Sequence, residues 1–147
     1  MWAYDPKLPK PRYDPQKARG LLRAAGWTFA DDGYAHKGGR RLSLVMTYAA
    51  GGATAAAVSL QVQAMLKRVG VQVVLKPVDA NQLFASWADN GVLSRGNFDL
   101  DWSGFFQLAD PDNTRTLTCE NRPPAGFNDS YFCNAAFEAA ERDALAH

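Results

Sequence analysis

The sequence predicts an α/β fold in which a mixed β-sheet is flanked by helices. Two apolar, β-rich stretches at residues 42–48 and 71–78 have the composition of strands. Between them, residues 57–69 show apolar positions at helical spacing, and Gly70 is a residue that readily adopts the left-handed conformation after a helix. A strand, helix and strand of this length form a right-handed crossover between parallel strands. The nearly continuous apolar character of the strands predicts that both sheet faces are covered.

The residues before this unit predict an arm, a helix and a hairpin. Residues 1–12 are rich in proline and predict an extended arm. Asp14 is expected to cap a helix that has Pro15 at its first position and ends at Gly26. Residues 27–36 contain an Asp-Asp-Gly turn and predict a short hairpin. The helix residues expected to face inward are Ala18, Leu21, Leu22 and Ala25.

The residues after this unit predict a third strand between helices. Asp79 is expected to cap a helix that Asn90 and Gly91 end, and residues 97–102 alternate as a strand. Residues 110–113 predict a turn before a short helix, and Asn134 is expected to cap the last helix. That helix is still in phase at residue 147, so we expect the chain to be truncated there.

Length and composition predict one compact domain over residues 1–147. The chain has 147 residues, of which 47% are hydrophobic, which is enough for a single core. Its formal charge of +1 gives no field that favours nucleic acid or an anionic membrane. No apolar run approaches the roughly 20 residues of a membrane span, and the first residues lack a signal-peptide pattern.

Four aspartates are the candidates for acid–base catalysis or for binding a hard cation. Asp110 and Asp112 occur in a motif typical of turns and helix caps, and Asp99 and Asp101 lie on the strand face opposite Trp102. The two histidines are far apart in the sequence, which argues against a metal cluster or a Ser-His-Asp triad. We therefore expect no enzyme, metal or cofactor, with a small aspartate-dependent hydrolase as the alternative.

Aromatic residues follow the ends of two predicted strands. Tyr48 ends the first central strand, and Trp102, Phe105 and Phe106 follow the third. Ligands of open α/β sheets bind outside the carboxyl ends of the strands, so these side chains are candidates to line a cleft. Burial in the core, or at an interface with further chain, explains them equally well.

Several motifs in order resemble the family 5 extracellular solute-binding proteins of ABC importers, the dipeptide, oligopeptide and nickel-binding class. They are Tyr-Asp-Pro-Gln-Lys-Ala at 13–18, Leu-Leu-Arg-Ala-Ala-Gly-Trp at 21–27, residues 60–73, Asn-Phe-Asp-Leu at 97–100, Trp-Ser-Gly at 102–104 and Asp-Pro-Asp-Asn at 110–113. The resemblance implies part of a lobe with a periplasmic-binding-protein-like fold. It also implies a periplasmic receptor that has no catalytic step and delivers its solute to a membrane permease.

The resemblance also bears on the cysteines and on the extent of the chain. Cys119 and Cys133 would close a loop of roughly fifteen residues, and their spacing alone leaves open whether they pair. The paired cysteines of dipeptide-type members imply that they form a disulfide. Because full members are several times longer, this chain is expected to be the C-terminal-side part of one lobe and to hold at most half a binding site.

Two departures from dipeptide-type members predict the class of solute. Such members have an acidic residue after Trp-x-Gly, where this chain has Phe105, and a basic residue after the first central strand, where it has Ala49-Ala50. Without these charged groups, we expect a longer peptide held by its backbone, or an uncharged solute such as an oligosaccharide. A self-associating interaction module is the remaining alternative. The predicted ligand-binding residues are Tyr48, Trp102, Ser103, Gly104, Phe105, Phe106, Asp110 and Asp112.

Overall fold

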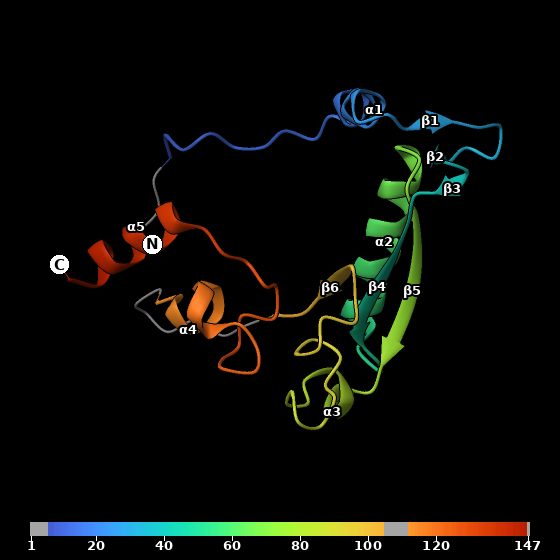
Figure 1. Ribbon diagram of the computed structural model, residues 1–147. Coiled ribbons are helices and arrows are strands. Elements are labelled where there is room, and N and C mark those ends of the chain that lie inside the picture. The colour runs from blue at the N-terminus through green and yellow to red at the C-terminus, as the bar shows by residue number, and fades with distance from the viewer. Residues whose placement is uncertain (1–5, 105–111, 147) are drawn as a thin grey trace.

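A parallel βαβ unit forms the centre of the computed structural model, which describes residues 6–104 and 112–146 (Figure 1). It consists of β4 (Ser43–Ala49), α2 (Ala53–Arg68) and β5 (Gln72–Val78). β4 and β5 pair in parallel along seven residues each. β6 (Leu100–Trp102) pairs in parallel with the other side of β4, which gives the strand order β5-β4-β6. The predicted parallel pairing of the two strands around α2 and the predicted third strand are therefore confirmed.

The main core lies between α2 and one face of this sheet. Its buried residues are Met46 on β4, Val73 on β5, and Val69 and Val71 beside the end of α2. Side chains alternate along a strand, so alternate residues of β4 and β5 point toward the helix. Gly70, with φ of +88°, lets the chain leave α2 and enter β5, and the predicted left-handed conformation is confirmed.

The opposite face of the sheet is covered only at the carboxyl ends of its strands. There Leu83, Val92 and Leu93 form a second buried cluster. Closer to the start of β5, Val74 is 46% exposed and lines a groove of about 410 Å³ together with Val45. The prediction that both faces are fully covered is therefore wrong for this part of the sheet.

The segment after β5 explains the exposed groove, because the predicted helix over residues 79–90 is wrong beyond its first turn. Asp79 accepts a hydrogen bond from Asn81 N, but α3 (Ala80–Leu83) contains four residues. The Ser86 hydroxyl donates to the Asp89 carboxylate at 2.6 Å and accepts from Asp89 N at 3.2 Å. Such local side-chain bonds compete with helical ones, so the chain turns back instead of covering the sheet.

The amino-terminal elements pack at the starting ends of the central strands. Asp14 caps α1 (Pro15–Ala24) by accepting from Lys17 N at 2.8 Å, as predicted. Ala18 and Leu22 pack on the main core, but Leu21 is 62% exposed, so its predicted inward orientation is wrong. One position along a helix rotates the side chain by about 100°, which carries Leu21 away from the core.

The predicted hairpin is confirmed as part of a second, antiparallel sheet. It contains β1 (Thr28–Phe29), β2 (Ala35–Lys37) and β3 (Arg40–Arg41), with β2 in the middle. The Ala35 amide donates to the Gly70 carbonyl at 2.7 Å, which joins this sheet to the end of α2. Parallel and antiparallel pairing thus occur in two separate sheets of one α/β fold.

The carboxyl-terminal segment lies to one side of the sheet and contains α4 (Thr114–Leu117), a 3₁₀ turn (Cys119–Asn121) and α5 (Ala135–Ala146) (Figure 1). Cys119 and Cys133 form a disulfide, as the resemblance implied. The Asn134 carboxamide oxygen accepts from Phe137 N at 3.0 Å and caps α5, as predicted. Among the described residues, none of the helices combines the length and the apolar character that crossing a membrane requires.

Among the described strands, β5 forms an outer edge of the parallel sheet. Gln72 N donates to Leu42 O and Ala50 N donates to Val78 O, so alternate residues from Gln72 onward direct their backbone groups toward β4. The intervening residues direct theirs outward. Among them, the Val73 carbonyl accepts from the side chain of Gln63 at 2.8 Å, and Pro77 has no N–H.

Candidate functional site

Two predicted ligand-binding aromatics meet where β4 and β6 end. Tyr48 and Trp102 are register partners on these parallel strands, whose backbones lie about 5 Å apart. Both belong to the same face of the sheet as Met46 and Leu100, because their positions have the same parity along each strand. Trp102 is 38% exposed and Tyr48 is half-buried. The edge therefore presents adjacent aromatic surface that a solute can reach.

A pocket of about 190 Å³, with four polar residues in a largely apolar lining, lies beside this edge. Asp101 lines it from β6, Ser103 lines it from the position that follows β6, and Asp129 and Ser130 line it from the loop between the two cysteines. Its apolar wall comes from Leu93 and Phe98. Gly104, the next residue predicted to bind ligand, is exposed.

Asp129 has the most distinctive electrostatic environment of this pocket. Burial raises the pKa of its carboxyl group, and the nearby negative charge of Asp101 raises that pKa further. Sequence reasoning missed Asp129 and Ser130. Nothing in their local pattern distinguishes them from other loop residues, because only the tertiary fold brings them beside Ser103.

The loop that presents Asp129 is fixed by specific contacts. Asn128 is fully buried, and its side-chain amide donates to Thr118 O at 2.8 Å and to Phe132 O at 2.7 Å. The Tyr131 hydroxyl donates to Ser94 O at 2.6 Å, which ties the loop to the segment before β6. Together with the disulfide, these bonds place the acidic wall of the pocket on a rigid frame.

Two of the candidate catalytic aspartates hold the strands together. Asp99 Oδ2 accepts from Val45 N at 2.7 Å, and Asp101 Oδ1 accepts from the Thr47 hydroxyl at 2.8 Å. Both carboxylates thus join β6 and the residues before it to β4. His36 belongs to β2, in the other sheet, so among the described residues the structure assembles no carboxylate–histidine pair at this edge.

The remaining predicted site residues belong to the segment that follows Gly104. Asp112 is exposed, and its Oδ1 accepts from Thr114 N at 2.8 Å. Hydrogen bonds from the side chain and the backbone of Thr114 lower the pKa of Asp112, which lies directly before Asn113, the N-cap residue of α4. Phe105, Phe106 and Asp110 lie outside the described residues. In the part of the chain that is described, no group of three His, Cys, Asp or Glu residues has the arrangement of a metal site.

Comparison with known families assigns this architecture. Residues 1–123 match the model for the bacterial extracellular solute-binding proteins, family 5 middle region. The chain belongs to family 5. Members of this family are substrate-binding proteins rather than enzymes, which excludes the aspartate-dependent hydrolase as an interpretation of the four aspartates. No curated protein sequence matches the chain.

Solved structures with the same fold include family 5 receptors for different solutes. The oligopeptide-binding protein AppA of Bacillus subtilis, solved with a nonapeptide, has a TM-score of 0.75 and 23% identity over 97% of this chain and 28% of AppA. NikZ of Campylobacter jejuni, solved with Ni(L-His), has a TM-score of 0.76 and 20% identity over 97% of this chain and 28% of NikZ. An oligopeptide-binding protein of Thermus thermophilus, solved with a pentapeptide, has a TM-score of 0.74 and 20% identity over 98% of this chain and 26% of its own. These likenesses establish the fold. The present chain spans little more than a quarter of the length of each of these three proteins.

Proposed function

We propose that this chain forms part of the solute-binding lobe of a periplasmic ABC-importer receptor and contacts a peptide-like solute for delivery to a membrane permease. The observation that supports this proposal is the juxtaposition of Tyr48 and Trp102 at the carboxyl edge of the parallel sheet in a family 5 fold. Open α/β sheets bind ligands at this edge, and a second lobe would close over it.

The two sides of the edge suit different parts of a peptide. The faces of Tyr48 and Trp102 can stack on planar peptide groups and on apolar side chains. On the other side, Asp101 and Asp129 form an acidic wall whose charge is costly to keep, as the raised pKa of Asp129 shows. A solute cation would offset that cost by favouring the charged carboxylate. We therefore propose a peptide with an ammonium or basic side chain near Ser103, which adds a charge preference to the peptide held by its backbone that the sequence predicted.

A calorimetric titration of the purified chain tests this proposal. The panel contains an extended peptide with a central lysine, the matched peptide with glutamate, an oligosaccharide and Ni²⁺. We expect saturable binding of the lysine peptide, with a higher melting temperature in its presence. Trp102→Ala should weaken that binding by roughly tenfold, because an aromatic contact of about 1.5 kcal/mol is removed. The matched control is Tyr13→Ala, which should leave the affinity unchanged. It removes an aromatic side chain of the amino-terminal segment that is 66% exposed.

Three outcomes would contradict the proposal. Binding of the oligosaccharide or of Ni²⁺ with no response to either peptide would exclude a peptide-like solute. Equal affinity for the lysine and glutamate peptides would remove the role given to Asp101 and Asp129. Undiminished binding by a folded Trp102→Ala variant would place the solute elsewhere on the chain.

A further inference from the structure

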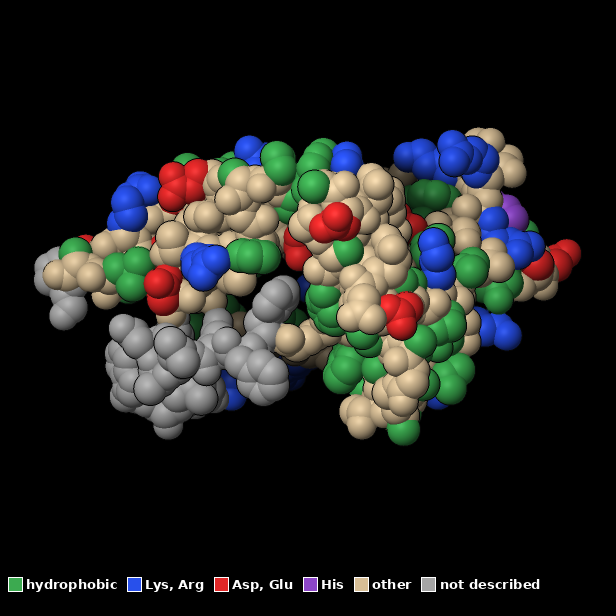
Figure 2. Space-filling view, turned by 90° about the horizontal axis from the view of Figure 1, so that it is seen from below, with side chains coloured by type: hydrophobic (Ala, Val, Ile, Leu, Met, Phe, Trp, Pro, Cys, Tyr) green, Lys and Arg blue, Asp and Glu red, His purple; other side chains and the backbone are tan. Residues whose placement is uncertain are grey.

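The nearly neutral chain separates its charges into two regions. Residues 14–41 together with Lys67 and Arg68 contain eight Lys or Arg and three Asp, a formal charge of +5. All other residues contain eight Lys or Arg and twelve Asp or Glu, a formal charge of −4. Figure 2 shows basic side chains gathered around the histidine at one end of the molecule. We call this region the basic end and define it by Lys17, Arg19, Arg23, Lys37, Arg40, Lys67 and Arg68.

Contacts between elements hold the basic end together. The Arg19 guanidinium donates to Arg68 O at 3.4 Å, which joins α1 to the end of α2. Arg19 and Arg23 both lie over the ring of Phe29, at 3.9 and 5.0 Å from its centroid. Lys37 Nζ donates to the backbone carbonyl that follows α1, at 2.8 Å. Like charges are thus kept close together by backbone and aromatic contacts.

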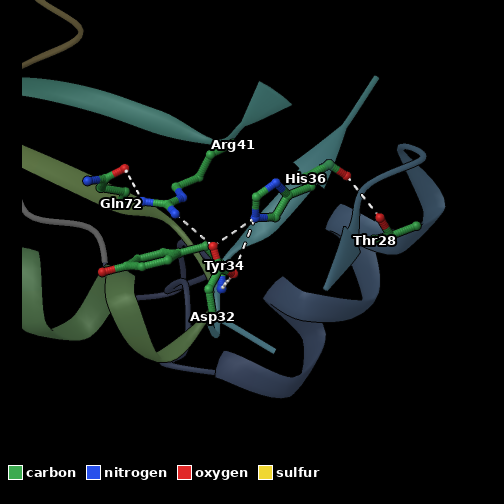
Figure 3. Close-up of polar contacts among 6 residues, drawn as sticks. All are labelled: Thr28, Asp32, Tyr34, His36, Arg41 and Gln72. Atoms are coloured by element: carbon green, nitrogen blue, oxygen red, sulfur yellow. Dashed lines mark hydrogen bonds and ion pairs between the residues drawn. The ribbon is translucent and has the colours of Figure 1, made fainter. Parts of the chain in front are cut away.

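The hairpin turn is fixed to the same end by a separate polar network (Figure 3). Asp32 accepts from Arg41 Nη2 at 2.8 Å, and its carboxylate lies 3.1 Å from His36 Nε2. Arg41 Nη1 also donates to the Gln72 side chain at 3.2 Å, which ties the hairpin to β5. The hydrogen bond from Tyr34 N lowers the pKa of Asp32, and His36 and Arg41 lower it further, which keeps the carboxylate charged. Arg41 is thereby neutralised, and for this reason it is not counted in the basic end.

The charges of the basic end itself are not neutralised within the described part of the chain. None of its seven members has a carboxylate within 4.0 Å there, since both ion pairs in that part involve Asp32. Six of the seven are exposed, and Arg19 is half-buried. Seven unpaired cations on one rigid surface create a local positive potential that the near-zero net charge conceals.

We propose that the basic end binds an anionic membrane surface. Lys and Arg side chains near anionic headgroups are each worth about 1 kcal/mol, which is roughly fivefold in the partition coefficient. Leu21 lies one turn after Lys17 on the outer face of α1 and is 62% exposed. An exposed leucine among basic side chains favours a lipid interface over a purely ionic partner. This proposal departs from the expectation, drawn from the net charge alone, that the chain has no field favouring an anionic membrane.

The topology also fixes how the bound molecule would be oriented. The basic end lies where β4 begins, next to β3, and Tyr48 lies near the end of β4, about 20 Å further along the strand. A chain that rests on lipid through its basic end therefore directs the edge with Tyr48 and Trp102 away from the bilayer. Membrane binding and solute binding use opposite ends of the sheet, so this inference does not rest on the identity of the solute.

Vesicle co-sedimentation of the full chain tests the proposal. At low salt we expect binding to vesicles of phosphatidylglycerol and phosphatidylcholine, and none to phosphatidylcholine alone. The double variant Arg40→Gln/Lys67→Gln removes two exposed charges and should lower the partition coefficient more than tenfold. The control Lys76→Gln/Arg142→Gln removes two exposed charges outside the basic end and should change it less than twofold. Leu21→Ser should weaken binding severalfold without changing the net charge.

Each contrary outcome would overturn the proposal. Absence of binding to anionic vesicles at low salt would show that the basic end has no affinity for lipid. Equal losses in the two double variants would show that only net charge matters. Full binding at high salt, where the screening length falls to about 3 Å at 1 M, would exclude an electrostatic mechanism. The solute titration uses the other end of the molecule, so the two proposals can fail separately.

Discussion

Replacing Gly70 by alanine should destabilise the fold through two separate effects. Gly70 has φ of +88°, and an L-residue in the left-handed region costs about 1–2 kcal/mol. A Cβ atom there would also lie 2.5 Å from Cε1 and 2.9 Å from Cδ1 of the Phe29 ring. Overpacking of this kind costs about 1–3 kcal/mol, so the sum is about 2–5 kcal/mol. The Phe29 ring also supports Arg19 and Arg23, and its displacement would loosen the basic end.

Gly33→Ala is the matched control, because it carries the backbone effect alone. Gly33 has φ of +81°, and nothing lies within 4 Å of an added Cβ atom. Urea unfolding followed by circular dichroism should therefore give a loss of about 1–2 kcal/mol for Gly33→Ala and a clearly larger loss for Gly70→Ala. Equal losses in the two variants would refute the argument that close packing against Phe29 requires glycine at position 70.

Four further predictions concern the carboxyl-terminal segment and the buried polar groups. Cys133→Ser opens the disulfide loop and should lower the free energy of unfolding by about 3 kcal/mol, measured in urea against the wild type under oxidising conditions. The fully buried Thr47 donates to Asp101, so Thr47→Val should cost about 1–3 kcal/mol. Ser59→Ala should be neutral or stabilising in the same assay, because the buried Ser59 hydroxyl has no partner among the described residues. The raised pKa of Asp129 means that the folded state holds its proton more tightly than the unfolded state, so wild-type stability falls as the pH rises above about 4. Asp129→Asn should accordingly be more stable than wild type at pH 7 and indistinguishable from it at pH 3, and a constant difference between melting temperatures at the two pH values would contradict this.

Local patterns were sufficient to predict the elements that the structure confirms. The apolar strands on either side of α2 and the glycine that follows it specify the parallel pair. Asp14, Asp79 and Asn134 identify helix starts through side-chain caps that involve residues only two or three positions away. In each case the determining interactions are short-range in sequence, so they are visible without the fold.

The omissions have long-range causes, whereas the error in the helix after Asp79 has a local one. The extent of that helix depended on whether Ser86 would bond to Asp89, three residues away, or leave the backbone helical. The pocket that Asp129 lines depended on a loop that the disulfide and Asn128 hold beside β6. The basic end depended on the spatial gathering of charges that are dispersed along the sequence. The pocket and the basic end have no local signature, because each is created by residues that meet only in the folded chain.

The outer edge of β5 affects how the chain behaves at high concentration. A free parallel edge is ordinarily a template on which another strand can add and start an aggregate. Here the Val73 carbonyl is already bonded to Gln63, and Pro77 cannot donate, so an incoming strand would find a complete donor–acceptor pair only at Leu75. The β5 edge is thus protected against templated polymerisation, and copies that associate on this side of the sheet would do so through side-chain surfaces such as the groove at Val74. Such contacts do not propagate a hydrogen-bonded sheet, so they favour small, reversible assemblies over fibres.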